Sequence, residues 1–275
     1  MGKKRHLHPE GGQIDETSEQ APDHCGTGKV RLFVEADLGV GLGVIPSPDQ
    51  CHYLLNVMRL KEGDSIRLFN GRDGEWVGQL AEVRKKTCLV ALQDQSRAQG
   101  SLPDIWLLFA PVKRARLDFM VQKAVEMGAS RIMPVMTQRT NVGRLKEERL
   151  RANAIEAAEQ CGLLSVPDIT PPTHLSRVLD QWGEIAPGRH ILFCDEAAPE
   201  GELLETLSRL RERGKQQPFA VLIGPEGGFS PHERTQLLSR EDTVALSLGA
   251  RIMRADTAAV AALAIVQLHL GDWSA

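Results

Sequence analysis

The sequence predicts an α/β protein in which a small β-barrel precedes a parallel sheet. Three observations lead to this prediction. Short β-prone segments follow one another at hairpin spacing between residues 65 and 92. From residue 104 onward, β-prone segments alternate with helical ones, as in parallel α/β sheets. Residues 219–257 contain two consecutive units in which a strand runs into a glycine loop and then a helix.

The N-terminal part is expected to hold a tail and then the barrel. Residues 1–29 are polar and without periodicity, which is typical of disorder. A strand is expected at 30–37, then a helix that begins with the capping box of Ser47 and Gln50. Further strands are expected at 65–69, 75–83 and 87–92. The polar stretch 95–103 marks a boundary, so we expect domains at 30–98 and 102–275.

The second domain is expected to alternate strands and helices. The expected strands are 104–110, 131–136, 190–194, 219–223 and 244–248, and the expected helices are 114–127, 146–161, 174–182, 201–213, one that follows Ser230, and 257–270. The last helix is apolar nearly all round, so we expect it either inside the core or against a partner.

Composition limits the possible functions. The 275 residues are 42% hydrophobic, enough for two domains or one large one. The net charge of −3 gives no general attraction to nucleic acid, so RNA would have to bind a local patch. The five cysteines are widely spaced without a CxxC pair, so we expect no zinc site, no disulfide framework and a reducing cytoplasm. The longest apolar run is too short to span a membrane, and we expect no secretory signal.

The two strand–glycine–helix units predict one pocket made mostly of main chain. The first unit runs into GPEGG and then a helix with Ser230 as N-cap, Pro231 at the first position and Glu233 completing a capping box. The second runs into Gly249 and an arginine-bearing loop before a helix capped by Asp256 or Thr257. Ligands of parallel sheets bind at the carboxyl ends of strands, where such loops lie.

The segments IGPEGGFSPHE (223–233) and LSLGARIMRADTA (246–258) resemble the SPOUT-class RNA methyltransferases. Within this class they are similar to the family that methylates N3 of a uridine in bacterial 16S rRNA with S-adenosylmethionine. The resemblance extends over nearly the whole chain from about residue 30. It implies a trefoil-knotted C-terminal domain, an N-terminal barrel like the PUA RNA-binding domain, and a homodimer formed through the knotted domain. Nothing in the spacing shows the knot.

The resemblance assigns S-adenosylmethionine to seven residues of the two loops. They are Leu222, Gly224, Gly227, Leu248, Gly249, Ile252 and Met253. The glycines would allow backbone groups to approach the cofactor closely, and the apolar side chains could pack against the adenine. The alternative is a pair of glycine-rich turns that serve packing only.

Three charged residues are candidates for catalysis. Arg254 cannot act as a base at neutral pH, but it can stabilise the uracil oxygens or hold a phosphate. Glu226 or Asp256 could accept the N3 proton or stabilise the positive charge of the sulfonium. The family more often has Leu-Arg-x-Glu where this chain has Met253-Arg254-Ala255-Asp256, so its carboxylate is shorter by one methylene. Arg251 could share the role of Arg254 or form an ordinary salt bridge.

Five basic residues are candidates for RNA binding: His52, Arg59, Lys113, Lys123 and Arg139. Family resemblance favours the first four, whereas solvated surface charge is the simpler interpretation. The chain departs from the family at Leu163-Leu164, where an arginine is usual. Two other functions therefore stay open: a related knotted methyltransferase acting on tRNA or ribose 2′-OH groups, and a non-catalytic RNA-binding factor for ribosome maturation.

Overall fold

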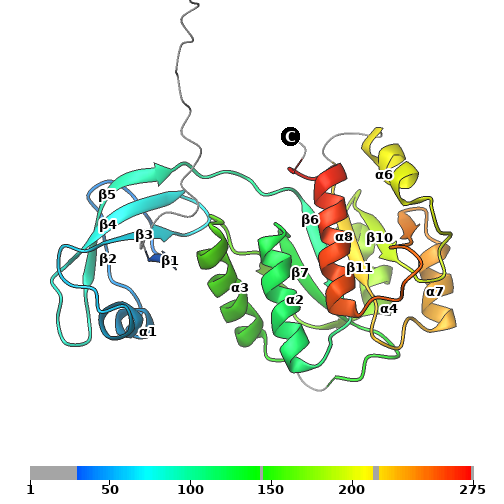
Figure 1. The fold of residues 1–275 in the computed structure, drawn as a ribbon, viewed down its shortest axis with the longest axis horizontal. Coiled ribbons are helices and arrows are strands. Elements are labelled where there is room, and N and C mark those ends of the chain that lie inside the picture. The colour runs from blue at the N-terminus through cyan, green and yellow to red at the C-terminus, as the bar shows by residue number, and fades with distance from the viewer. Residues whose placement is uncertain (1–29, 143–144, 213–216, 274–275) are drawn as a thin grey trace, which may run out of the picture.

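The computed structural model describes residues 30–142, 145–212 and 217–273, which form a five-stranded and a seven-stranded sheet. Figure 1 shows the smaller sheet on the left, the larger on the right, and α3 between them. The expected disordered tail at 1–29 lies outside the described residues, as does Arg213 at the end of one expected helix. Within the described ranges, no helix is both long and apolar enough to cross a lipid bilayer.

The smaller sheet surrounds its own core. Its elements are β1 (Arg31–Phe33), β2 (Gly43–Val44), α1 (Pro48–His52), a π-helix η1 (Tyr53–Val57), β3 (Ser65–Phe69), β4 (Glu75–Ala81) and β5 (Leu89–Arg97), in the strand order β1-β3-β4-β5-β2. The predicted capping box is confirmed, because the Ser47 side chain accepts from the Gln50 amide. β5 pairs with β4 as far as Arg97, so the first three residues of the expected boundary are strand instead.

The larger sheet is parallel throughout. Its strands are β6 (Ile105–Phe109), β7 (Arg131–Met136), β8 (Asp168–Ile169), β9 (Thr173–His174), β10 (His190–Cys194), β11 (Phe219–Ile223) and β12 (Thr243–Leu246). The order is β12-β10-β11-β6-β7-β8, and β9 also pairs with β7. Every residue of β6 and β11 is buried, as expected for central strands covered on both faces. Because the strands are parallel, their carboxyl ends share one edge.

Helices cover both faces of this sheet. They are α2 (Arg114–Glu126), α3 (Glu147–Cys161), α4 (Leu175–Asp180), α5 (Trp182–Ile185), α6 (Leu203–Glu212), α7 (Pro231–Leu238) and α8 (Ala255–Leu270). One buried cluster joins the sheet to α2, α3, α6 and α8, and a second joins it to α4, α5 and α7. The prediction of an α/β fold with a parallel sheet is therefore confirmed, while the trefoil threading stays a prediction.

Helix α8 begins earlier than expected and packs into the core. The expected cap at Asp256 or Thr257 is wrong, because the carbonyl of Arg254 accepts the first helical bond from Ala258 N at 2.8 Å. One face of α8 is buried against α2, α6 and β11. The fully buried Gln267 donates to Met127 O at 2.6 Å and fixes α8 to the end of α2. This face of α8 therefore lies in the core, as one of the two alternatives expected. Contact between the exposed face of α8 and a partner stays a prediction.

Candidate active site

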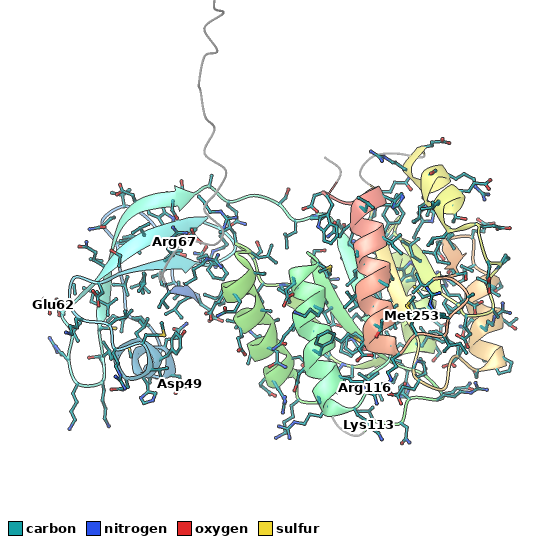
Figure 2. The ribbon with its side chains drawn as sticks, in the orientation of Figure 1. Asp49, Glu62, Arg67, Lys113, Arg116 and Met253 are labelled. Carbon is teal, nitrogen blue, oxygen red and sulfur yellow. The ribbon has the colours of Figure 1, made fainter. Side chains whose placement is uncertain are left out.

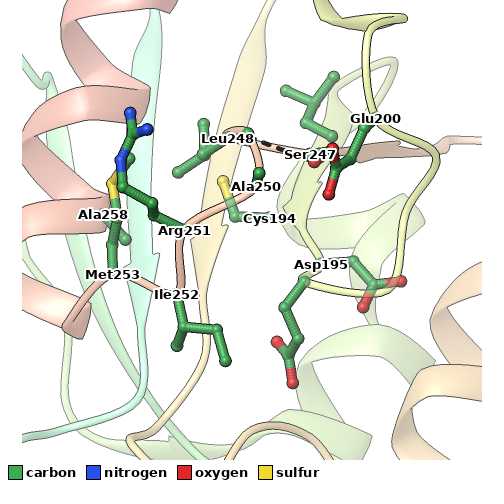
Figure 3. Close-up of a pocket in the computed structure, with 13 residues that line it drawn as sticks. Cys194, Asp195, Glu200, Ser247, Leu248, Ala250, Arg251, Ile252, Met253 and Ala258 are labelled. Carbon is green, nitrogen blue, oxygen red and sulfur yellow. Dashed lines mark hydrogen bonds between the residues drawn. The ribbon is translucent and has the colours of Figure 1, made fainter.

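A pocket opens where β10 and β12 end at the carboxyl edge of the sheet (Figure 3). It is lined by Cys194, Asp195, Glu196, Glu200, Leu246, Ser247, Leu248, Gly249, Ala250, Arg251, Ile252, Met253 and Ala258. About 580 Å³ of space lies within it, part of it open to solvent.

The second glycine loop lines this pocket directly. Leu248, Gly249, Ile252 and Met253, four of the seven residues expected to hold the cofactor, are among its walls. Gly249 has φ of 100°, a left-handed conformation that side chains other than glycine rarely adopt. Ile252 is 91% exposed, which leaves a large apolar side chain free to cover a ligand.

The first glycine loop lies beside the pocket. Leu222 is fully buried in the core cluster below, together with Phe193. A Cβ on Gly224 would meet the Phe229 ring at 2.6 Å, so this glycine serves close packing of that ring. Gly227 is exposed, and its carbonyl accepts from Arg139 Nη1 at 2.8 Å. These three residues are outside the pocket walls, whereas Glu196 Oε1 lies 2.9 Å from where a Cβ on Gly228 would be.

Sequence reasoning missed the acidic wall that follows β10. Asp195 is 4% exposed; its Oδ2 accepts from Arg234 Nε at 2.9 Å and its Oδ1 from Ala197 N at 3.1 Å. Glu196 and Glu200 are exposed on the same loop. The signal was available, since carboxylates directly after a buried parallel strand lie at the ligand-binding edge.

The three catalytic candidates do not form one hydrogen-bonded group. Arg254 occupies the N-cap of α8 with an exposed side chain. Asp256 lies in the first turn, and its carboxylate accepts from Thr257 N at 3.1 Å. Glu226 is paired with Arg116 of α2, so the first glycine loop is tied to that helix. Figure 2 shows Lys113 and Arg116 at the same end of α2.

The five RNA-binding candidates differ in their surroundings. His52 Nδ1 lies 2.8 Å from Asn56 Nδ2 on the exposed side of α1. Arg59 follows the π-helix with φ of 56°, unusual for a residue other than glycine. Lys113 is exposed at the N-cap of α2. Lys123 forms an ion pair with Glu126 at 2.7 Å, as an ordinary solvated surface charge would. Arg139 donates to Gly227 O in the first glycine loop.

No metal cluster occurs in the part of the chain that the structure describes: no group of three or more His, Cys, Asp or Glu side chains is placed to hold an ion. The four described cysteines are free, and Cys51 and Cys88 have their sulfurs 3.8 Å apart. Burial raises the pKa of the Cys88 thiol to about 11, which makes it unreactive at neutral pH.

Comparison with known proteins decides the family. A model of the RNA methyltransferase domain matches residues 100–267, and a model of the RNA methyltransferase PUA domain matches residues 46–93. This chain belongs to the RNA methyltransferase family. The resemblance seen in the two glycine loops is therefore confirmed, and the smaller sheet corresponds to the PUA-like domain of this family.

Relatives and solved structures agree with the family. The chain is 30% identical to ribosomal RNA small subunit methyltransferase E of Rickettsia conorii over 239 residues, which cover 86% of this chain and 95% of the relative. It is 26% identical to the Bacillus subtilis protein of the same name, with 79% and 87% covered. The same enzyme of Neisseria gonorrhoeae, solved with S-adenosylmethionine bound, has a TM-score of 0.77 and 28% identity and covers 90% of this chain and 100% of its own. A Legionella pneumophila structure, also in complex with S-adenosylmethionine, has a TM-score of 0.78 at 28% identity with the same coverage.

Proposed function

We propose that this protein transfers a methyl group from S-adenosylmethionine to N3 of a uridine in 16S rRNA of the small ribosomal subunit. One observation carries the proposal: the second glycine loop of an RNA methyltransferase chain lines an open pocket at the carboxyl ends of β10 and β12. The relatives named as small subunit methyltransferases support the choice of rRNA.

The pocket residues fit S-adenosylmethionine. The backbone of residues 246–253 offers hydrogen-bonding groups, and Leu248, Ile252 and Met253 offer apolar surface for an adenine ring. Glu196 and Glu200 bring carboxylates that form no salt bridge within the described ranges. Carboxylates suit a ligand that bears a sulfonium and an ammonium group. The bound cofactor would supply an electrophilic methyl group.

The chain's own residues would orient the base and move its proton. We assign Arg254, exposed at the start of α8, to the uracil oxygens, where negative charge develops as N3 attacks. Glu226 is held by Arg116, so Asp256, two residues from Arg254, is the better candidate to accept the N3 proton. Glu226 would then hold the first glycine loop against α2.

RNA would be held by both domains. We assign this role to His52 and Arg59 in the PUA-like domain and to Lys113, Lys123 and Arg139 in the larger domain, of which Lys123 must share its charge with Glu126. We also propose the division into domains 30–98 and 102–275, the trefoil knot, a cytoplasmic location and a homodimer formed through the larger domain. The exposed Leu268 and Trp273, at 50% and 49%, support an apolar contact near the end of α8.

Two measurements test this function. Calorimetry of the purified chain with S-adenosylmethionine is expected to show one site per chain. Incubation with 30S particles or with naked 16S rRNA from a strain lacking the modification is expected to yield 3-methyluridine, detected by nucleoside mass spectrometry. A 2′-O-methylated product or methylated tRNA would replace this function with that of another knotted methyltransferase. No cofactor binding at millimolar concentration would favour the non-catalytic maturation factor.

A further inference from the structure

A buried carboxylate surrounded by arginines lies where the PUA-like domain meets helix α3. Glu75, at the start of β4, is completely buried. Its oxygens lie 2.7 Å from Arg31 Nε, 3.5 Å from Arg67 Nη1 and 4.0 Å from Arg97 Nη1. The Ser96 hydroxyl donates to the same carboxylate at 2.9 Å. Three positive charges therefore surround one negative charge, and the group carries a positive excess.

Two of these arginines reach across the interface to the end of α3. Arg31 donates to Ala158 O, Glu159 O and Leu163 O at 2.9, 2.8 and 2.8 Å. Arg97 donates to Gly162 O at 2.7 Å. The last carbonyls of a helix lack helical partners and carry partial negative charge. The positive group on one domain therefore neutralises the helix end on the other.

Neighbouring contacts extend this interface in both directions. Phe33 N, in β1, donates to Glu159 Oε1 at 2.9 Å, and Gln99 Nε2 donates to Ser165 Oγ at 3.0 Å. Phe69 of the PUA-like domain is fully buried in the core cluster of the larger domain, and Arg31 lies over its ring at 4.6 Å. The two domains thus share both apolar and polar contacts.

The same interface includes Leu163-Leu164, where the chain departs from the family. Leu164 is buried in the core cluster of the larger domain and Leu163 packs against it, so neither side chain replaces the family arginine. The loop that they form is anchored from the other domain, because Leu163 O accepts from Arg31.

We propose that Arg31 is a positioning residue for the RNA substrate: braced by Glu75, it fixes the PUA-like domain on α3, so that both domains contact one RNA at once. The inference rests on the proposed function. In Figure 1, α1 of the PUA-like domain and the start of α2 lie toward the same lower side of the molecule. RNA contacts on two domains reinforce each other most strongly when their geometry is already fixed, because binding then carries no cost of ordering the domains.

The chemistry of Arg31 makes this role specific to arginine. Its Nε donates to Glu75, one terminal nitrogen donates to carbonyls in the last turn of α3, and the other donates to Leu163 O in the loop that follows. A lysine ammonium carries the same charge but cannot span these partners. Burial alone raises the pKa of Glu75, but hydrogen bonds from Arg31 and Ser96 and the charges of Arg31 and Arg67 outweigh it and hold the pKa below its usual value. Glu75 therefore stays charged at neutral pH.

The test compares Arg31→Lys and Glu75→Gln with a matched control in the full-length chain. The control is Arg151→Lys, because Arg151 pairs with Glu35 at 3.1 Å across the same two domains, but with both side chains exposed. If the correct arrangement falls to a tenth of the population, apparent RNA affinity falls about tenfold. We therefore expect the Kd for 30S particles, measured by filter binding, to rise about tenfold in both test variants. The S-adenosylmethionine Kd should stay within about twofold, and the control should match the wild type.

A second readout reports the interface without RNA. Hydrogen exchange at the Phe33 amide, which donates to Glu159, is expected to speed up in Arg31→Lys and not in Arg151→Lys. An unchanged RNA Kd in a variant with faster exchange would overturn the proposal, since the contact would then serve stability alone. A parallel loss of cofactor affinity, or unchanged exchange, would overturn it as well. A wild-type chain that binds 30S particles without methylating them would remove the proposed function, while the RNA Kd of the variants would still decide this inference.

Discussion

Replacing Asp195 with alanine is expected to loosen the acidic wall of the pocket. The wild-type carboxylate accepts from Arg234 Nε at 2.9 Å and from Ala197 N at 3.1 Å, and only 4% of the residue is exposed. These bonds hold residues 195–200, which carry Glu196 and Glu200 into the pocket. The variant therefore loses the anchor of this wall without losing any of the other lining side chains.

The size of the effect follows from the two lost bonds. A hydrogen bond between charged groups contributes about 1.5–3 kcal/mol, and one from a neutral amide about 0.5–1.5 kcal/mol. The Arg234 side chain is 41% exposed and will be hydrated in the variant, so we expect a net loss of about 2 kcal/mol of the free energy that holds this wall in place. A change of about 1.4 kcal/mol corresponds to a tenfold change in Kd. If residues 195–200 contact the cofactor, the Kd for S-adenosylmethionine should therefore rise between about tenfold and thirtyfold.

Calorimetry on the full-length chain measures this change, with Asp242→Ala as the control. Asp242 accepts two bonds from Arg240, at 2.8 and 2.7 Å, before β12 and outside the pocket walls. The control should lose some thermal stability and keep its cofactor affinity. An unchanged Kd in Asp195→Ala, or an equal loss in Asp242→Ala, would refute the assignment of residues 195–200 to the binding wall.

Three further predictions concern single side chains. Arg254→Ala should lower the single-turnover methylation rate about 100-fold or more and leave the S-adenosylmethionine Kd within about twofold, because the side chain would act on the base alone; an equal loss of cofactor affinity would contradict this role. Glu196→Gln should lower the affinity for S-adenosylmethionine, which carries one net positive charge, about fivefold, and the affinity for the neutral S-adenosylhomocysteine much less. Glu202→Gln, outside the pocket, should change neither affinity. Glu159 tests pH dependence: burial raises its pKa, although the Phe33 amide and Arg31 act in the opposite direction. The folded chain therefore holds this proton more tightly than the unfolded one, and the stability that protonation provides is lost as pH rises through the folded pKa. The Tm of Glu159→Gln relative to wild type should accordingly increase from pH 4 to pH 8, and a constant difference would be the contrary result.

Features encoded by neighbouring residues were predictable from the sequence. The capping boxes at Ser47 and Ser230 formed as expected, because a side chain three residues away completes each of them. The strands 131–136, 190–194 and 219–223 have the expected bounds, since they are flanked by polar, proline or glycine residues. The predicted start of α8 was wrong because the side-chain preference of N-caps favoured Asp256, whereas the carbonyl of Arg254 accepts the first helical hydrogen bond.

The site itself depended on the tertiary structure. The acidic wall of residues 195–200 and the loop of residues 247–253 meet only because β10 pairs with β12, two strands that are about 50 residues apart in the sequence. Arg31 finds its carbonyl partners 127–132 residues away, at the end of α3. The sequence by itself determined the elements and the family motifs, because capping and periodicity act over a few residues. Which residues face the pocket and which join the two domains was decided by long-range packing, for which local pattern carries no signal.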